Sequence, residues 1–493
     1  MFESAALSHV LDKVEYKKQE PLLRTELLEA QFAFVEKKTF PVVVVIAGND
    51  GAGKAACVRK LYEWLDPHHL ETHAFWTPTE EERMRPRMWR YWQALPPKGK
   101  IGFLFGSWYH QPLHDRILNR ISPVEFEREL QVIDNFESML AAEGALILKF
   151  WLHIARAERG AQNKKKGKKE HQPKGEFEEW GDISHDDYER SVEAAEMMAR
   201  ITSTGYAPWI VVPSNDHRFR DLTIGQTILE ALRKRLDCQQ SLVSVSAPAV
   251  LTSLDRRNVL NGMDLSQKLT VAEYEQQLAR YQLKLSRLTE HKTFEKIAVV
   301  SIFEGNDAAG KGSVIRRVSQ GLDPRRFQAH ATAAPTDEEK AQPYLWRFWR
   351  RLPRRGHFAS FDRSWYGRVL VERIEGFCSE AEWLRAYNEI NDFELQMTEA
   401  GFVVAKFWLA VSKQEQLNRF RDREKTDFKR FKITDEDWRN RHKWDDYAIA
   451  VGDMVDRTST RYAPWTLVEA EDKLFARVKV LKTLCERIGA MIG

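Results

Sequence analysis

Short runs of consecutive apolar residues, rather than alternating ones, mark the predicted strands of this chain. Residues 42–47 read Val-Val-Val-Val-Ile-Ala and end in a glycine-rich turn, and residues 297–303 form a similar run before a second such turn. Further runs lie at 358–361 and 402–408, and helical patterns follow each glycine-rich turn. Runs that are apolar on both faces are typical of buried parallel strands. Strands alternating with helices predict an α/β fold in which helices sandwich a parallel sheet.

The chain contains an internal repeat whose period is far longer than that of a solenoid. Gly48, in the first glycine-rich turn, recurs as Gly305, an offset of 257 residues (305 − 48). The same offset aligns Ser-Trp-Tyr at 107–109 with Ser-Trp-Tyr at 364–366. A register kept over so long a stretch indicates a tandem duplication of a whole domain.

The duplication sets the predicted domain organisation. The first copy takes residues 1–235 and the second takes 271–493, and the segment 236–270 between them contains a stretch rich in Ser, Ala and Pro. Such a composition is typical of a linker. The chain has 493 residues, the length of two or three ordinary domains, so two copies account for it.

Composition narrows the class of protein. Hydrophobic residues make up 43% of the chain and charged residues 30%, as expected for a globular rather than a disordered protein. The net charge of +4 indicates no partner by itself, although Lys and Arg cluster at 164–169 and 419–443. None of the four cysteines forms a CxxC pair, and no apolar run approaches the roughly 18 residues that span a membrane. Without a signal-peptide pattern either, we expect a cytoplasmic protein with no membrane partner.

A phosphate-binding loop follows the second predicted strand. Residues 305–311, Gly-Asn-Asp-Ala-Ala-Gly-Lys, match the first seven positions of GxxxxGK[ST] between a strand and a helix. Gly305, Asn306, Gly310 and Gly312 are expected to cradle phosphate with backbone N–H groups, and Lys311 to reach the transferring phosphoryl group. Gly312 stands where a Ser or Thr usually binds Mg²⁺, with Ser313 one position later, so another group must hold the metal.

A second acidic position ends the strand predicted at 358–361. Asp362 has the form of the strand-end carboxylate that meets Mg²⁺ in P-loop enzymes. Arg363 and Arg368 follow, and arginines there suit bidentate phosphate contacts. Asp362 and Asp307 would hold Mg²⁺, or Mn²⁺, through carboxylate oxygens. In the first copy Asp362, Arg363 and Arg368 are replaced by Phe105, Gly106 and Gln111. The first copy is therefore predicted to keep the fold but not the chemistry.

The basic segment 419–443 admits two interpretations. Its arginines, Arg419 and Arg423 among them, suit a helical lid that closes over phosphates and excludes water. The same pattern also fits a solvated amphipathic helix whose charges pair with neighbouring acids. Both interpretations stay open from the sequence.

Three motifs together resemble the polyphosphate kinase 2 family. They are EGNDAAGKGS at 304–313, FDRSWYGR at 361–368 and DRTSTRYAPW at 456–465. The resemblance extends over both halves of the chain, whose arrangement is similar to that of the family's two-domain members. It implies a P-loop kinase-like fold, duplicated in tandem with a helical lid in each copy. It further implies transfer of a phosphoryl group from inorganic polyphosphate to AMP, giving ADP, by the C-terminal copy.

The resemblance also assigns roles to residues. Asp307 and Asp362 would be the metal and acid/base carboxylates, and Lys311, Arg363 and Arg368 would bind and polarise phosphates. Lys406, Arg419 and Arg423 would line the polyphosphate path. Gly367 departs from the Asn that the family motif often carries. The implied partners are polyphosphate and AMP or ADP, without nucleic acid, and homo-oligomer formation is left open.

Two other functions remain from the residues alone. An NTP-dependent nucleoside monophosphate kinase would share the P-loop and an arginine-rich lid, although Gly312 disfavours ordinary Mg·ATP binding. A non-catalytic polyanion-binding protein would suit the degenerate first copy, but not the intact Asp307, Lys311, Asp362 and Arg363 of the second.

Overall fold

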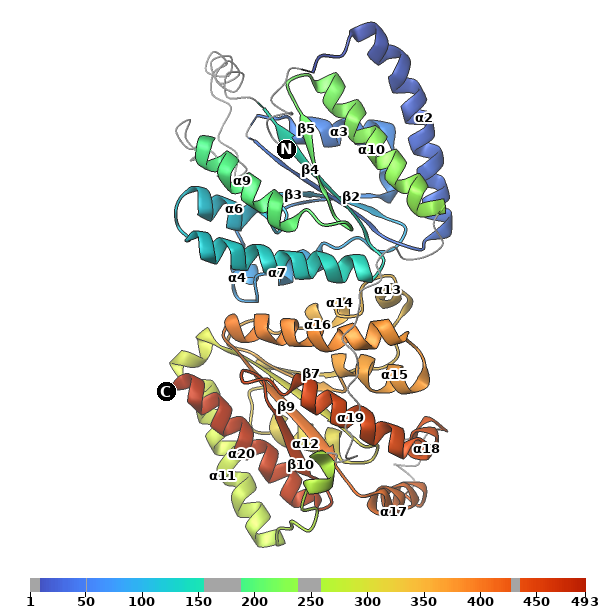
Figure 1. Ribbon diagram of the computed structural model, residues 1–493. Coiled ribbons are helices and arrows are strands. Elements are labelled where there is room, and N and C mark those ends of the chain that lie inside the picture. The colour runs from blue at the N-terminus through green and yellow to red at the C-terminus, as the bar shows by residue number, and fades with distance from the viewer. Residues whose placement is uncertain (1–8, 50, 155–187, 238–258, 427–434) are drawn as a thin grey trace. The chain divides into compact units, whose positions relative to one another are not determined.

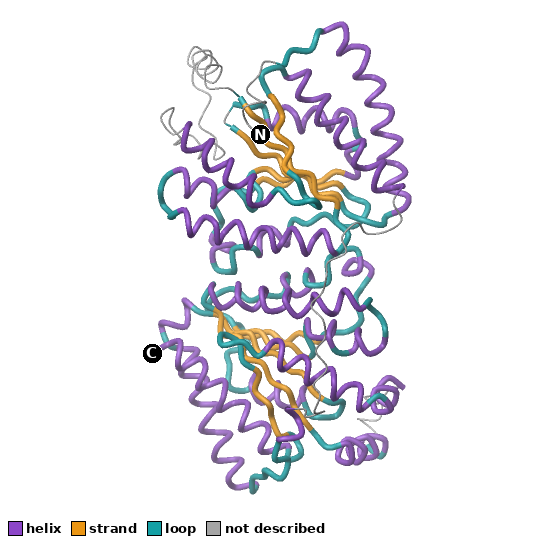
Figure 2. Tube along the Cα trace, viewed as in Figure 1, coloured by secondary structure: helices purple, strands orange, loops and turns teal. Residues whose placement is uncertain are grey.

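The computed structural model describes residues 9–49, 51–154, 188–237, 259–426 and 435–493 (Figures 1 and 2). The chain divides into two compact units. One comprises Met1–Thr79, Arg90–Ser244 and Thr336–Pro343, and the other comprises Glu80–Trp89, Val245–Pro335 and Tyr344–Gly493.

The first half of the chain alternates strands and helices, as the apolar pattern predicts. Its elements are α2 (Lys13–Lys37), β1 (Val42–Gly48), α3 (Lys54–Trp64), η1 (Pro67–His69), β2 (Leu70–Ala74), α4 (Glu80–Arg83), α5 (Trp89–Gln93), β3 (Ile101–Phe105), α6 (His110–Ile117), α7 (Pro123–Ala142), β4 (Leu146–His153), α9 (Tyr188–Thr202), β5 (Trp209–Pro213) and α10 (His217–Asp237).

The second half repeats this order. Its elements are η4 (Val259–Gly262), α11 (Val271–Glu290), η5 (Lys292–Lys296), β6 (Ala298–Gly305), α12 (Lys311–Ser319), β7 (Phe327–Ala331), α13 (Asp337–Lys340), α14 (Trp346–Trp349), β8 (Phe358–Asp362), η6 (Trp365–Val369), α15 (Val371–Glu375), α16 (Glu380–Glu399), β9 (Phe402–Ala410), α17 (Lys413–Glu424), α18 (Asp435–His442), α19 (Trp444–Thr458), β10 (Trp465–Glu469) and α20 (Lys473–Ile492).

Each unit contains one five-stranded parallel sheet, and the two sheets have the same strand order. The orders are β2-β3-β1-β4-β5 and β7-β8-β6-β9-β10. The registers repeat as well: Val42 of β1 lies opposite Ile101 of β3, and Val299 of β6 lies opposite Phe358 of β8. The predicted α/β fold and its duplication are therefore confirmed. The strand that carries each glycine-rich turn lies at the centre of its sheet.

Helices cover both faces of each sheet (Figures 1 and 2). In the first unit α2, α3 and α10 pack together on one face, and α6, α7 and α9 pack together on the other. In the second unit α11, α12 and α20 correspond to the first group, and α15, α16 and α19 to the second. The strands between two helical layers are buried on both faces, which explains their unbroken apolar runs.

The two copies also share the capping residues that begin corresponding helices. Ser122 and Glu125 form a capping box at the start of α7, and Ser379 and Glu382 form the same box at the start of α16. In each, the serine hydroxyl and the glutamate carboxylate satisfy N–H groups that the first helical turn leaves open. Helix position is thus fixed by local chemistry that the duplication preserved.

The predicted linker and lids lie partly beyond the described residues. α10 ends at Asp237 and α11 begins at Val271, with residues 238–258 of the predicted linker outside the described part. In the second unit α17 and α18 occupy the predicted lid segment, and the matching segment of the first copy falls in residues 155–187, which are not described.

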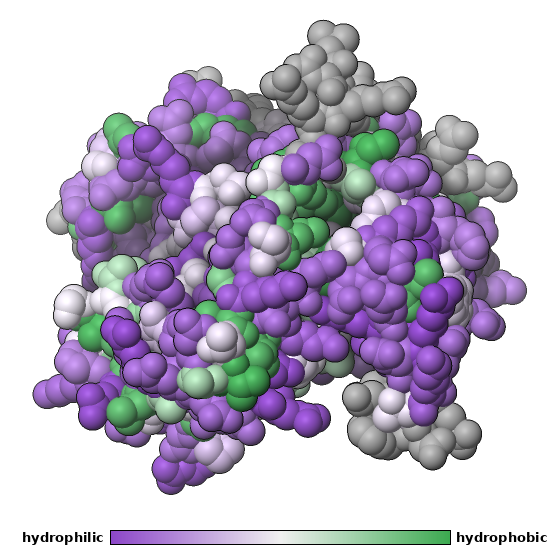
Figure 3. Space-filling model, turned by 90° about the horizontal axis from the view of Figure 1, so that it is seen from below, coloured by the Kyte–Doolittle hydropathy of each residue, from purple (hydrophilic) through white to green (hydrophobic). Residues whose placement is uncertain are grey.

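The described surface is polar over most of the face seen in Figure 3. Hydrophobic residues there form small separate areas among hydrophilic ones. Within the described residues, no helix combines the length and the apolar character that crossing a membrane requires.

Candidate active site

The second unit holds its phosphate loop between β6 and α12. Gly305 and Gly310 adopt φ angles of 148° and 107°. A Cβ at Gly305 would lie 2.4 Å from the carbonyl oxygen of Leu409, so only glycine fits there. The Lys311 ammonium donates to the carbonyl oxygens of Gly305 and Asn306 at 2.8 and 3.3 Å. The ammonium therefore lies across the mouth of a loop whose N–H groups can bind an anion.

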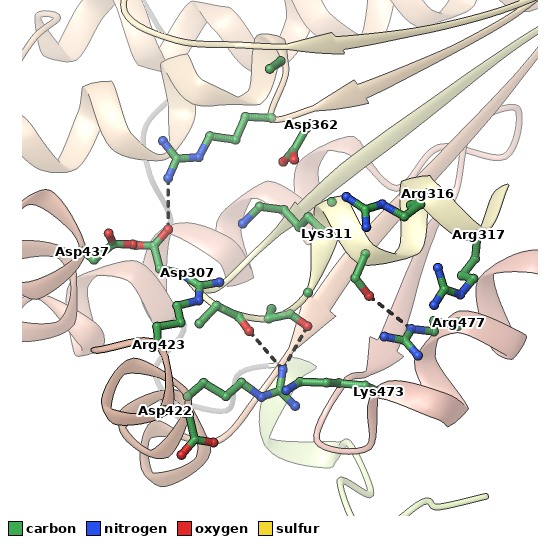
Figure 4. A pocket seen from close by; sticks show the side chains of 18 of the residues that line it. Asp307, Lys311, Arg316, Arg317, Asp362, Asp422, Arg423, Asp437, Lys473 and Arg477 are labelled. Carbon is green, nitrogen blue, oxygen red and sulfur yellow. Dashed lines mark hydrogen bonds and ion pairs between the residues drawn. The ribbon is translucent and has the colours of Figure 1, made fainter. Parts of the chain in front are cut away.

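A cavity of about 820 Å³ opens in front of this loop; we call it the basic cavity. Its basic lining residues are Lys311, Arg316, Arg317, Arg363, Arg419, Arg423, Lys473 and Arg477, and its acidic ones are Asp307, Asp362, Asp422 and Asp437. Figure 4 shows Lys311 between Asp307 and Asp362, with Arg316, Arg317 and Arg477 on the side away from Asp307. The excess of cations over carboxylates makes this cavity attractive to a polyanion.

The chain turns sharply where β8 ends at Asp362. Arg363 adopts a φ of 62°, which is uncommon for a residue with a side chain. Thr332 holds this turn by donating its hydroxyl to the Arg363 carbonyl at 2.9 Å. The turn brings the Arg363 guanidinium to the Asp307 carboxylate at 3.0 Å. Asp307, Lys311, Asp362 and Arg363, predicted from separate motifs, therefore lie around one cavity.

Two carboxylates of the basic cavity fit a divalent cation. The described residues contain no group of three or more His, Cys, Asp and Glu side chains that could hold a metal by themselves. Mg²⁺ does not need one, because it keeps several waters and binds through one or two carboxylates together with substrate phosphates. Asp307 and Asp362 supply such oxygens on either side of Lys311. A Cβ at Gly312 would lie 3.6 Å from Asp362 Oδ2, so the hydroxyl missing from that position leaves space beside the carboxylate.

A second cavity, of about 460 Å³, meets the basic cavity; we call it the adjoining cavity. Asp307, Thr332 and Arg363 line both cavities, so the two meet at these side chains. Its apolar and aromatic lining residues are Ala333, Ala334, Pro335, Leu370, Val371, Phe377, Trp408, Trp444 and Tyr447. About half of its lining residues are polar or charged, among them Glu304, Arg347, Glu372, Glu436 and Arg439. A cavity that offers both an apolar surface and hydrogen-bonding groups suits a small molecule with both kinds of surface.

Glu304, at the end of β6, lines the adjoining cavity and was not singled out from the sequence. Its carboxylate is buried and accepts a hydrogen bond from the Ser364 hydroxyl at 2.9 Å. Burial raises the pKa of Glu304 above its usual range. The first copy has Ala47 at this position. A charge lost from the first copy is the signal that also distinguished Asp362, and it would have identified Glu304.

Helix α18 of the predicted lid segment contacts the site directly. Asn440 donates its side-chain amide to Asp307 Oδ2 at 2.9 Å. The Glu436 carboxylate lies 3.6 Å from the Arg363 guanidinium. Residues 427–434, between α17 and α18, lie outside the described residues. Neither Asn440 nor Glu436 belongs to a phosphate-binding motif, so only the tertiary structure identifies them.

Lys406 is not brought to the site, which corrects its predicted phosphate contact. It lies in β9, and its side chain is completely buried. Its ammonium donates to Glu394 at 2.6 Å, to the Tyr366 hydroxyl at 2.9 Å and to the Thr458 carbonyl at 2.6 Å. A lysine has three N–H donors, and all three are used in the core.

Other predicted phosphate ligands differ in their placement. Arg423 lines the basic cavity (Figure 4). Arg419 also borders it but is buried and gives its N–H groups to protein oxygens, which corrects its predicted phosphate contact. Arg368 lines neither cavity and pairs with Glu372 at 2.8 Å, so its predicted catalytic contact is corrected too. Asn306 can offer its backbone, because its side-chain oxygen accepts from the Val411 N–H at 3.3 Å.

The first unit repeats the loop, but a different side chain lies against it. The Lys54 ammonium donates to the first two loop carbonyls at 3.0 and 3.1 Å, as Lys311 does. Arg220 of α10, however, lies 2.0 Å from where a Cβ of Gly53 would be, and it donates to the Ala52 carbonyl at 3.1 Å. Asp50, the counterpart of Asp307, lies outside the described residues.

Large side chains stand where the second unit has its adjoining cavity. The 257-residue offset matches the cavity-lining residues Ala333, Gly367 and Val371 with Trp76, His110 and His114. The Trp76 and His110 rings meet edge to face at 5.9 Å, and the His110 and His114 rings stack at 6.2 Å. Burial lowers the pKa of His110 to about 3. The corresponding space in the first unit therefore holds packed side chains.

These features define a P-loop kinase fold with a basic cavity in front of its phosphate loop. The chain belongs to the Polyphosphate kinase 2 family, whose model matches residues 10–240 and 268–492. The chain is 50% identical over 492 residues to the polyphosphate:AMP phosphotransferase of Pseudomonas aeruginosa, covering 99% of both chains. It is 34% identical over 483 residues to the enzyme of that name from Acinetobacter johnsonii, covering 96% of both. A crystal structure of a polyphosphate kinase 2 from Pseudomonas aeruginosa matches with a TM-score of 0.90 and 49% identity, over 100% of this chain and 99% of that one.

Proposed function

We propose that this protein transfers a phosphoryl group from inorganic polyphosphate to AMP, giving ADP, and that the second unit alone carries the reaction. The names of the two curated relatives supply the substrates. The observation that carries the assignment to the second unit is the junction of its two cavities. A polyanion-attracting cavity and a small-molecule cavity share Asp307, Thr332 and Arg363 there.

The chemistry needs positioning and charge neutralisation more than covalent catalysis. An oxygen of the AMP phosphate attacks the terminal phosphorus of polyphosphate, forming one P–O bond. The bond from that phosphorus to its bridging oxygen breaks, and the chain leaves one phosphate shorter. Lys311 and Arg363 stabilise the negative charge on the transferring group, because both lie at the loop where it must pass.

The orientation of substrates follows from the two cavities. Polyphosphate occupies the basic cavity, where Arg316, Arg317 and Arg477 neutralise phosphates beyond the reacting one. AMP occupies the adjoining cavity, with its base among the apolar side chains and its phosphate directed to Arg363. The reacting end of polyphosphate and the phosphate of AMP would then meet at the junction of the two cavities, where in-line transfer can occur.

A divalent cation has a defined place in this account. Asp307 and Asp362 would hold Mg²⁺ or Mn²⁺, and the bound ion would neutralise charge on the phosphoryl oxygens. In the first copy the counterpart of Asp362 is Phe105, an apolar residue that offers no metal ligand.

The test compares phosphoryl donors. ADP formation from AMP and Mg²⁺ is measured with long-chain polyphosphate or with ATP as the sole donor. We expect product with polyphosphate. Product with ATP alone would overturn the proposal in favour of an NTP-dependent kinase. Failure with both donors and with GMP as acceptor would overturn it in favour of a polyanion-binding protein.

A further inference from the structure

Three consecutive carbonyl groups of the phosphate loop are held from outside by helix α17. Gln416 donates its side-chain amide to the Asp307 carbonyl at 3.2 Å. One nitrogen of the Arg419 guanidinium donates to the carbonyls of Ala308 and Ala309 at 3.0 and 3.1 Å. Gln416 and Arg419 are 2% and 3% exposed, so these bonds are sheltered from water.

The remaining donors of Arg419 are also engaged by the protein. Its Nε donates to Glu415 at 2.7 Å, and its second terminal nitrogen donates to the carbonyls of Ala470 and Glu471 at 2.7 and 2.9 Å. A guanidinium has five N–H donors in a fixed plane. All five have protein acceptors, so Arg419 has no N–H left for a phosphate.

These bonds determine where the loop N–H groups point. In a trans peptide the carbonyl and the following N–H point in opposite directions. Holding the carbonyls of Asp307 and Ala309 outward therefore turns the N–H groups of Ala308 and Gly310 toward the inside of the loop. Ala308 and Gly310 have positive φ angles of 62° and 107°, and Ala309 between them does not. Alternation of this kind lets backbone N–H groups converge on an anion. The Ala309 N–H is used within the loop, where it donates to the Asn306 carbonyl at 3.0 Å, which leaves the N–H groups of Ala308 and Gly310 for the phosphate.

We infer that Arg419, assisted by Gln416, is a positioning residue that orients the peptide groups of the phosphate loop toward polyphosphate. Arg419 acts through the fixed geometry of its five N–H groups rather than through its charge. The inference rests on the proposed function, because it assumes that polyphosphate binds this loop.

The first unit supplies a matched control within the same chain. There the loop is contacted by Arg220 of α10, which donates to the Ala52 carbonyl, the counterpart of Ala309. The other Arg220 contacts include its neighbour Asp221 at 2.8 Å. A buried arginine thus contacts each loop, but only the one in the second unit has the proposed role in phosphate binding.

The experiment separates geometry from charge. Arg419→Lys keeps the charge but not the planar donor set, and Arg419→Gln loses both. We expect both variants to lose about 10²-fold in kcat/KM for polyphosphate, mainly through a raised polyphosphate KM, with the AMP KM changed by less than about threefold. Arg220→Lys should leave all three constants unchanged.

If Arg419→Lys keeps a near-wild-type polyphosphate KM while Arg419→Gln raises it, the inference is overturned. Arg419 would then act through its positive charge rather than through its geometry. Equal increases in both KM values would also overturn the inference, because general loosening of the unit does not discriminate between substrates. If circular dichroism shows that Arg419→Lys is unfolded, Gln416→Met decides. Because Gln416 also lines the adjoining cavity, this variant is judged on polyphosphate alone. It should raise the polyphosphate KM several-fold, and an unchanged polyphosphate KM would contradict the inference.

Lys311→Ala in the same assay distinguishes the two proposals. An inactive Lys311→Ala beside a fully active Arg419→Lys would remove only the positioning role. A fully active Lys311→Ala would remove the proposed function of the second unit itself.

Discussion

The two units of this protein have the same sheet, the same register and the same buried polar cluster, and both keep the P-loop lysine. They differ at the strand end, where Asp362 and Arg363 correspond to Phe105 and Gly106, and at the adjoining cavity, where Ala333 corresponds to Trp76. Lys149 contacts Glu137, Tyr109 and Thr202 in the first unit at distances within 0.1 Å of those around Lys406 in the second. The duplication therefore separates residues that both copies keep for the fold from the cavity-lining charges of Glu304, Asp362 and Arg363, which the second copy has and the first copy lacks.

The largest expected effect tests the strand-end carboxylate. Asp362→Asn should lower kcat by about 10³-fold, because it removes a charged oxygen from the proposed site of the transferring phosphoryl group and the divalent cation. The measurement is the initial rate of ADP formation from AMP and polyphosphate. Phe105→Leu, at the matching position, should leave the rate within about twofold. A polyanion binder without catalysis would show no rate to lose.

The buried Lys–Glu pairs should contribute equally to the stability of their units. Lys149→Met and Lys406→Met each leave a buried carboxylate without its partner, which costs about 3–5 kcal/mol. Urea unfolding should show comparable losses in the free energy of unfolding for the two variants. At low urea concentration only Lys406→Met should reduce activity, because it loosens the unit that is proposed to carry the reaction. Strong stability loss in one variant and none in the other would show that the two clusters are not equivalent.

Transplanting a side chain from the first unit should close the adjoining cavity of the second. The carbonyls of Trp76 and Ala333 accept the same hydrogen bond, from Arg90 and Arg347 respectively, both at 2.9 Å. The local backbone can therefore carry either residue. Ala333→Trp should lower kcat/KM for AMP by about 10²-fold, with the polyphosphate KM little changed. Ala333→Ser is the size control, and full activity of Ala333→Trp would place the acceptor elsewhere.

The smallest effect concerns pH and belongs to the first unit. Burial, reinforced by His114, Lys54 and Arg90, lowers the pKa of His110 to about 3 from an ordinary value near 6.5. The unfolded chain binds this proton below about pH 6.5, and the folded unit does not until about pH 3. Stability is therefore lost as pH falls through that window, by roughly 2 kcal/mol at pH 5.

His110→Gln should weaken this loss of stability on acidification. The measurement is the urea unfolding free energy at pH 7 and pH 5, compared between wild type and variant. An identical pH dependence in the two proteins would show that His110 is not buried in its neutral form.

The sequence predicted the fold well because the information was local and repeated. Apolar runs marked β1, β6, β8 and β9, and the glycine-rich turns placed two phosphate loops at equivalent strand ends. Asp362 was recognisable because it ends a strand next to the loop strand. These features depend on neighbours in sequence, which a single chain displays directly.

The basic residues were harder to place, because their roles depend on distant partners. Lys406 is turned into the core by Glu394, and Arg419 by the loop carbonyls. The presence of Lys149 at the matching position of the first copy, which lacks the counterparts of Asp362 and Arg363, was an available sign that Lys406 is structural. For Arg419 the repeat gave a different sign, because the 257-residue offset matches it with Gln162 of the first copy. That difference indicated a role specific to the second copy, but only the tertiary contacts show that Arg419 holds loop carbonyls.

The most direct test of a single active unit compares the two P-loop lysines. Lys54 and Lys311 make the same contacts to their own loops, so alanine at either position makes the same local change. ADP formation from AMP and polyphosphate should fall by at least about 10²-fold in Lys311→Ala and remain within about twofold of wild type in Lys54→Ala. Equal losses in the two variants would contradict the account, because they would show that both units take part in the reaction.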